Sequence, residues 1–201
     1  MLRLCTNIGV IRKMTNMQHR QRGFNLIELL VTMVILAAVA GVAVPSFISM
    51  LDRRAISAEA NRIVRSINLT RSKAVNGGRQ FNATMERTSA TANDWSTGWR
   101  VFVDDDGNLA TAYDAVNDQL LYDISVDTRA VSIISTVADR IMFNSQGRLV
   151  NGGTVYFSVC DAPPYSADID GTLVTIRATG TPSTSTIAAA DKAAECANPG
   201  P

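Results

Sequence analysis

The first clear pattern in the chain is a long uncharged stretch near its N-terminus. No residue from Leu29 to Leu51 is charged, and most of them are apolar. A bilayer core of about 30 Å needs about 20 helical residues, so this stretch is long enough to cross a membrane. A buried helix of a soluble protein and a secretory signal peptide are the alternatives. The stretch is too long for a signal peptide, and helical sequence continues directly after it.

The helical pattern continues beyond this stretch in an amphipathic form. Asn76–Gly78 supplies a stop signal. We therefore predict one helix from Leu26 to Val75, with a kink or local melting near Gly41 to Pro45, because Pro45 lacks a backbone donor. Apolar residues recur at helical spacing among mostly basic ones, and these are expected to form the buried face: Ile56, Ala60, Ile63, Ile67 and Ala74.

After Gly78 the period changes from helical to alternating, which predicts β-strands. Phe81, Ala83 and Met85 alternate with polar residues. Further short apolar runs follow at Trp99–Val103, Leu120–Ile124, Val131–Ile134, Ile141–Phe143, Thr154–Cys160 and Leu173–Ala178. Turn residues separate several of them, at Asp104–Asn108, Asn144–Gly147 and Asn151–Gly153.

No second set of helices is available to cover a parallel sheet. The predicted fold class is therefore α+β, with a long N-terminal helix packed on an antiparallel β-sheet head. The C-terminal stretch, 182–201, is rich in Thr, Ser, Ala and Pro, and we expect it to form a coil.

The charges are segregated along the chain, although 19 basic and 18 acidic residues leave a net charge of only +1. Residues 1–23 carry five bases and no acid, residues 52–79 carry seven bases and two acids, and residues from 80 onward carry seven bases and 15 acids. The head is thus acidic, at −8, and the helical segment before it is basic, at +5. By the positive-inside rule the basic leader is cytoplasmic, and everything after Leu51 lies across the membrane.

Glu28 does not fit a plain membrane anchor, because an acid in a membrane helix costs energy unless it is paired. A cut between Gly23 and Phe24 would create an amino terminus within one turn of Glu28, where it could neutralise the carboxylate in the same or a neighbouring chain. A carboxylate wetted by lipid headgroups is the alternative.

The run from Gly23 to Val31, GFNLIELLV after a short basic leader, resembles the class III signal of type IV prepilins and type II secretion pseudopilins. The resemblance implies cleavage between Gly23 and Phe24 by prepilin peptidase and N-methylation of Phe24. It also implies a role for Glu28 in subunit docking, and it matches Pro45 to a helix-kinking proline. The expected segments are a removed leader, 1–23, a transmembrane and assembly helix, 24–51, a helical stem, 52–79, and a head with a C-terminal tail, 80–201. A leader that runs from Met1 to Gly23 is long, and Met17 would give a more usual one, so the start at Met1 or Met17 stays open.

The head extends the resemblance. Trp95–Asp104 with the turn after it, and Ile141–Arg148, look like the GspH/FimT-type minor subunits, and so does a late strand ending in Cys160 with a second Cys near the terminus. With Cys5 discarded in the leader, Cys160 and Cys196 remain as an even pair in an oxidising compartment, and we predict that they bond. Two free thiols are the alternative.

Neither a metal site nor catalysis is expected. Asp104, Asp106 and Asn108 present oxygen ligands, but Gly107 and Ala115 do not fit the spacing of an EF-hand, so a solvated hairpin turn is favoured. The one histidine, His19, lies in the leader, which leaves no imidazole in the processed chain. We therefore expect no enzyme, no cofactor and no metal.

The resemblance implies a minor pilin or pseudopilin that helps to initiate assembly of a type IV pilus. The alternatives are minor pseudopilin H of a type II secretion system and a DNA-binding minor pilin for transformation. The implied partners are other pilins or pseudopilins in a filament, prepilin peptidase, the inner-membrane assembly platform and membrane lipid. The implied location is the bacterial inner membrane, as a single-pass protein with a periplasmic head, followed by incorporation into a pilus or pseudopilus. An acidic head would repel phosphates, so nucleic acid is not expected as a partner.

Overall fold

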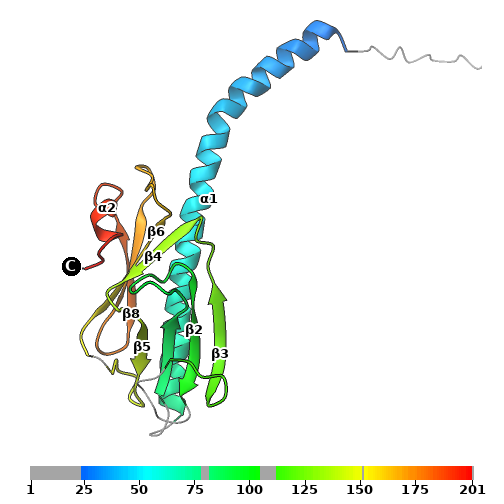
Figure 1. Ribbon diagram of the computed structural model, residues 1–201. Coiled ribbons are helices and arrows are strands. Elements are labelled where there is room, and N and C mark those ends of the chain that lie inside the picture. The colour runs from blue at the N-terminus through cyan, green and yellow to red at the C-terminus, as the bar shows by residue number, and fades with distance from the viewer. Residues whose placement is uncertain (1–23, 78–81, 105–111, 151, 201) are drawn as a thin grey trace, which may run out of the picture. The chain divides into compact units, whose positions relative to one another are not determined.

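The computed structural model describes residues 24–77, 82–104, 112–150 and 152–200 of the chain (Figure 1). The chain divides into two units between Val42 and Ala43, and each unit is treated by itself. The first unit contributes the beginning of helix α1. The second contains the rest of α1 and all of the described strands.

Helix α1 runs from Leu26 to Asn76 without interruption. The helix remains intact across Gly41 to Pro45, so the expected local melting does not occur, because neighbouring hydrogen bonds hold the helix where a proline removes one donor. A kink at Pro45 stays a prediction. The helix ends one residue beyond the predicted Val75, where the Gly77 amide donates to the Lys73 carbonyl at 2.9 Å. Gly78 lies outside the described residues.

The described strands form two four-stranded antiparallel sheets. The first sheet has the order β3-β2-β1-β5, with β1 at Asn82–Arg87, β2 at Gly98–Asp104, β3 at Asp118–Ser125 and β5 at Arg140–Phe143. The second has the order β4-β6-β7-β8, with β4 at Val131–Ser135, β6 at Val155–Asp161, β7 at Gly171–Ile176 and β8 at Pro182–Ile187. Each predicted apolar run overlaps a strand, and the α+β class is confirmed. Phe81 lies outside the described residues.

The expectation of a coil over 182–201 is wrong. Pro182–Ile187 forms β8 at the edge of the second sheet, and Lys192–Glu195 forms the short helix α2. Strand β8 has four exposed Ser and Thr side chains in a row, so it shows no apolar alternation. Its position follows from backbone pairing with β7 in a continuous register from Pro182 to Ile187, and the proline stands at the first position of an edge strand, where its missing donor is tolerated.

One hydrophobic core joins the stem to both sheets. Figure 1 shows the second half of α1 lying along the strands. The predicted buried face of the stem is confirmed, since Ile56, Ala60, Ile63, Ile67 and Ala74 are each at most 3% exposed. In this core, the rings of Trp95 and Phe157 meet edge to face with centroids 5.1 Å apart. Each large side chain buried in this way contributes about 1.5–3 kcal/mol of stability.

A glycine is required at the start of β2. Gly98 has a φ of 127°, a conformation that other residues rarely adopt, and a Cβ there would overlap the carbonyl oxygen of Ile124 on the paired strand β3. The glycine therefore allows β3 to approach β2 directly before Trp99. The Trp99 indole N–H then donates to the Ser66 hydroxyl of α1 at 2.9 Å, inside the core.

Candidate functional site

Phe24 and Glu28 are exposed at the N-terminal end of α1. Phe24 is the first described residue and is 81% exposed. The Asn25 side chain accepts the Ile27 amide at 3.4 Å and so caps the helix. Glu28 lies exposed in the first turn, where the positive end of the helix dipole favours a negative charge. Gly23 lies outside the described residues.

The first part of α1 has an unusually large exposed apolar surface. Among the described residues, α1 is the one helix long and apolar enough to cross a membrane, and its most apolar stretch contains no buried residue. Leu26, Ile27, Leu36 and Val42 are each 65% exposed or more. A soluble monomer rarely leaves so much apolar surface uncovered, so this segment requires a bilayer or other helices around it.

Three arginines of the stem donate hydrogen bonds to backbone carbonyls of the head. Arg53 donates to the Asp168 carbonyl at 2.7 Å, Arg62 to the Ser125 carbonyl at 3.4 Å and Arg71 to the Gly147 carbonyl at 3.0 Å. These carbonyls belong to the β6–β7 connection, the end of β3 and the turn after β5. The amphipathic pattern of the sequence does not reveal this function of the arginines.

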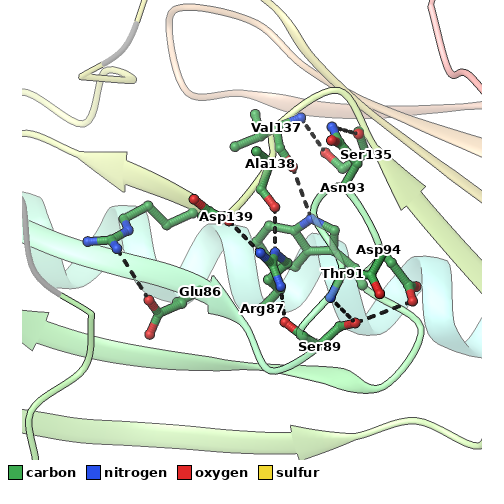
Figure 2. Close-up of polar contacts among 12 residues, drawn as sticks. Glu86, Arg87, Ser89, Thr91, Asn93, Asp94, Ser135, Val137, Ala138 and Asp139 are labelled. Atoms are coloured by element: carbon green, nitrogen blue, oxygen red, sulfur yellow. Dashed lines mark hydrogen bonds and ion pairs between the residues drawn. The ribbon is translucent and has the colours of Figure 1, made fainter.

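A polar cluster around Arg87 joins the β1–β2 connection to the β4–β5 connection (Figure 2). The Arg87 guanidinium binds the Ala138 carbonyl at 2.5 Å, the Asp139 carboxylate at 2.5 Å and the Ser89 carbonyl. Asn93, which has a φ of 65°, donates to the Ser135 carbonyl at 2.7 Å. Because β1 and β4 belong to different sheets, the cluster fixes the two sheets to each other.

The C-terminal tail is held to the second sheet by two linkages. The predicted disulfide is present between Cys160 and Cys196, whose Cα atoms are 6.2 Å apart. In the chain-entropy model a loop of this size contributes about 3–4 kcal/mol. Beside it, the Lys192 ammonium is buried and donates to the Asp161 carboxylate at 2.7 Å, to the Ile169 carbonyl at 2.7 Å and to the Ser166 carbonyl.

The other predicted site residues do not converge on one place. Asp104 lies buried at the end of β2, and Asp106 and Asn108 lie outside the described residues. Within the described ranges, no three His, Cys, Asp or Glu side chains are grouped to hold a metal ion. Asp104, the first residue of the predicted solvated turn at Asp104–Asn108, is thus part of a strand and is buried. The rest of that turn and the absence of a metal stay predictions.

The comparisons with known proteins agree with this architecture. The family described as type II transport protein GspH matches residues 59–193, and the prokaryotic N-terminal methylation motif matches residues 18–44. No curated protein matches the chain in sequence.

Two crystal structures of the type IV minor pilin FimU from Pseudomonas aeruginosa are similar in fold. One has a TM-score of 0.53 at 18% identity, over 68% of this chain and 92% of that chain. The other has a TM-score of 0.50 at 19% identity, over 64% of this chain and 91% of that chain. The minor pseudopilin EpsH from Vibrio cholerae gives a TM-score of 0.44 at 12% identity, over 65% of this chain and 95% of that chain.

The GspH match covers more than half of the chain, and the methylation motif precedes a helix with an exposed apolar surface. A membrane-anchored subunit that assembles with other pilins in a filament has these features. The chain belongs to the GspH family and is a minor pilin or pseudopilin.

Proposed function

We propose that the chain is a minor pilin that helps to initiate assembly of a type IV pilus from the inner membrane, with its head in the periplasm. The observation that carries the proposal is the uninterrupted helix α1, which begins as an exposed apolar segment with a single acid and ends in the core of the head. Such a helix joins a membrane anchor to a folded head in one element. The likeness to FimU, a type IV minor pilin, supports the pilus over the secretion pseudopilus.

The proposal includes processing of the N-terminus by prepilin peptidase. Cleavage between Gly23 and Phe24 and methylation of Phe24 would leave an N-terminal amine one helical turn from Glu28. An exposed carboxylate in an apolar helix requires a cation when it leaves water, and the amine of a neighbouring subunit supplies one. Glu28 would thus direct docking into the growing filament at the assembly platform.

Replacing Glu28 tests this docking role. We expect Glu28→Gln to be processed normally but to enter filaments at least about tenfold less, which corresponds to about 1.4 kcal/mol. Asp52→Asn, at the next acid along α1, is the matched control and should behave as the wild type. Quantitative immunoblots of the filament and membrane fractions measure both variants. Normal incorporation of Glu28→Gln would refute the docking role.

A type II secretion pseudopilus is the second candidate function, favoured by the description of the matching family as a type II transport protein. Removing the gene separates the two. Loss of surface pili with normal protein secretion supports the pilus, and the reverse result supports the pseudopilus.

DNA binding is less favoured. The sequence from residue 80 onward has a net charge of −8, and of the two bases in the C-terminal region, Arg177 and Lys192, the second is 1% exposed with its ammonium fully engaged. A phosphate backbone needs several accessible cations. We therefore expect no shift of DNA in a gel at low salt.

A further inference from the structure

A groove lies between the stem and the outer strand of the first sheet. It has a volume of about 640 Å³ and is lined from α1 by Arg62, Arg65 and Leu69, and from β3 by Tyr122, Asp123 and Ile124. We call it the β3 groove. Tyr122 is 57% exposed and Ile124 is 6% exposed, so the groove combines an accessible aromatic side chain with a buried apolar floor.

Strand β3 forms one edge of its sheet and is the longest of the described strands, at eight residues. One side of its backbone pairs with β2, and the other side has no strand beside it among the described residues. The strand contains no proline or lysine to discourage pairing. Of the described head residues with exposed large apolar side chains, three lie on or just before β3, namely Val116, Leu120 and Tyr122. An edge with these features is suited to accept an extended segment.

The charges on the helix side of the groove are positive. Arg65 is exposed, and its guanidinium Nε donates to the Asn61 carbonyl of its own helix. Arg62 is partly exposed and forms an ion pair with Glu59, with 3.4 Å between its Nη1 atom and Oε1 of the carboxylate. On the strand side, Asp123 is paired with Arg100 at 3.7 Å. Arg62 is already bound to the Ser125 carbonyl and to Glu59, so the groove offers the exposed guanidinium of Arg65 to a carboxylate that enters beside Tyr122.

The chemistry of β3 argues against a second copy as the occupant. Pairing of two β3 strands would bring Asp118 and Asp123 of both copies to one seam, and like charges across paired strands are destabilising. A different chain avoids this repulsion when its extended segment places apolar residues opposite Asp118 and Asp123 and turns one carboxylate toward Arg65 of the stem. Such a segment is complementary to Arg65, to Tyr122 and to the open edge.

We infer that the β3 groove is the docking surface for an extended, mainly apolar segment with one carboxylate, which belongs to a neighbouring, different pilin subunit. The segment pairs with the open edge of β3, places its carboxylate against Arg65, and packs an apolar side chain on Tyr122 and Leu69. This inference rests on the proposed function, because the partner is the next subunit of the filament.

Photocrosslinking of the full chain in filament-forming cells tests the docking surface. A photoreactive benzoyl-phenylalanine takes the place of Tyr122, and in a matched control it takes the place of Thr184, which is exposed on edge strand β8 of the other sheet. We expect position 122 to give an adduct with another pilin, mapped by mass spectrometry to a mainly apolar segment that contains an acid, and position 184 to give none. An adduct with a second copy, the same adduct from both positions, or no adduct in filaments that contain the chain would overturn the inference.

Charge reversal tests the arginines. We expect Arg65→Glu to lower the yield of the Tyr122-position adduct about tenfold, because it sets like charges against each other. Arg54→Glu, at an exposed arginine outside the groove on the same helix, should leave the yield unchanged. A lysine in place of the mapped acid should restore the yield with Arg65→Glu. Equal yields from Arg65→Glu and the wild type would overturn the inference. Absence of the wild-type chain from filaments would instead refute the proposed function.

Discussion

Glu59 is a carboxylate in an unfavourable position on the stem. Its Oε2 atom is buried and has no hydrogen-bond partner, while Oε1 lies 3.4 Å from the Arg62 guanidinium. Burial raises the pKa of Glu59, and the positive charge of Arg62 opposes this effect. The Glu59 carboxyl therefore keeps its proton up to a higher pH in the folded state than in the unfolded state. The contribution of Glu59 to stability therefore falls as the pH rises through its folded pKa.

We predict that Glu59→Gln reduces this pH dependence. In thermal unfolding of the detergent-solubilised chain, the wild type should lose more stability than the variant as the pH rises from about 4, just below the ordinary pKa of a glutamate, through the raised pKa of Glu59. Asp123→Asn removes an acid from a more exposed arginine pair and is the control, with an expected pH dependence like that of the wild type. Parallel curves for Glu59→Gln and the wild type would show that the buried carboxylate does not titrate in this way.

The disulfide and the buried stem residues could be predicted from the sequence, but the hydrogen bonds of the stem arginines to the head could not. Arg53, Arg62 and Arg71 follow one another at intervals of nine residues. Each residue of an α-helix turns the chain by about 100°, so Arg62 lies on the opposite side of the helix from Arg53 and Arg71. That spacing is compatible with arginines that bind the head on both flanks of the helix. Bonds to backbone carbonyls leave no pattern in the partner sequence, so the partners could not have been predicted.

The elements differ in how clearly the sequence specifies them. The second half of α1 and strand β4 bury apolar side chains at a regular period, and β2 and β6 are apolar runs that bury nearly every side chain, so the hydrophobic pattern predicts these elements. Strand β8 exposes hydroxyl side chains, and its backbone hydrogen bonds to β7 fix its position. The hydrophobic periodicity of the sequence therefore does not predict this strand. Helix α2 has four residues and is held by tertiary contacts, which a local pattern does not encode.

Lys192 is the tertiary contact that most directly fixes α2. Its three donors bind three oxygens of β6 and the β6–β7 connection. Removal of the ammonium would leave the Asp161 carboxylate buried without a counter-charge. We predict that Lys192→Met lowers the free energy of unfolding by about 3–5 kcal/mol.

Urea unfolding with the disulfide intact measures this effect. Lys73→Met, at an exposed lysine of α1, is the matched control and should change the free energy of unfolding by no more than about 0.5 kcal/mol. A loss for Lys192→Met no larger than that of the control would mean that the disulfide alone holds the tail.

At the scale of the whole molecule, the segregation of charge has a structural meaning. Part of the +5 charge of residues 52–79 is used within the subunit, where Arg53, Arg62 and Arg71 bind head carbonyls. Arg54, Arg65 and Lys73 are exposed. A basic stem beside an acidic head favours subunits that meet in a fixed register, because complementary charges set specificity more than affinity.

The proposed function requires that the chain is processed at Phe24 and enters a filament as a pilin. Mass spectrometry of the isolated filament fraction measures both steps. We predict a chain that begins with N-methylated Phe24 and carries an intact Cys160–Cys196 disulfide, and its disappearance from that fraction in cells without prepilin peptidase. A chain that is confined to the membrane fraction, or that enters filaments still beginning upstream of Phe24, would refute the proposed function.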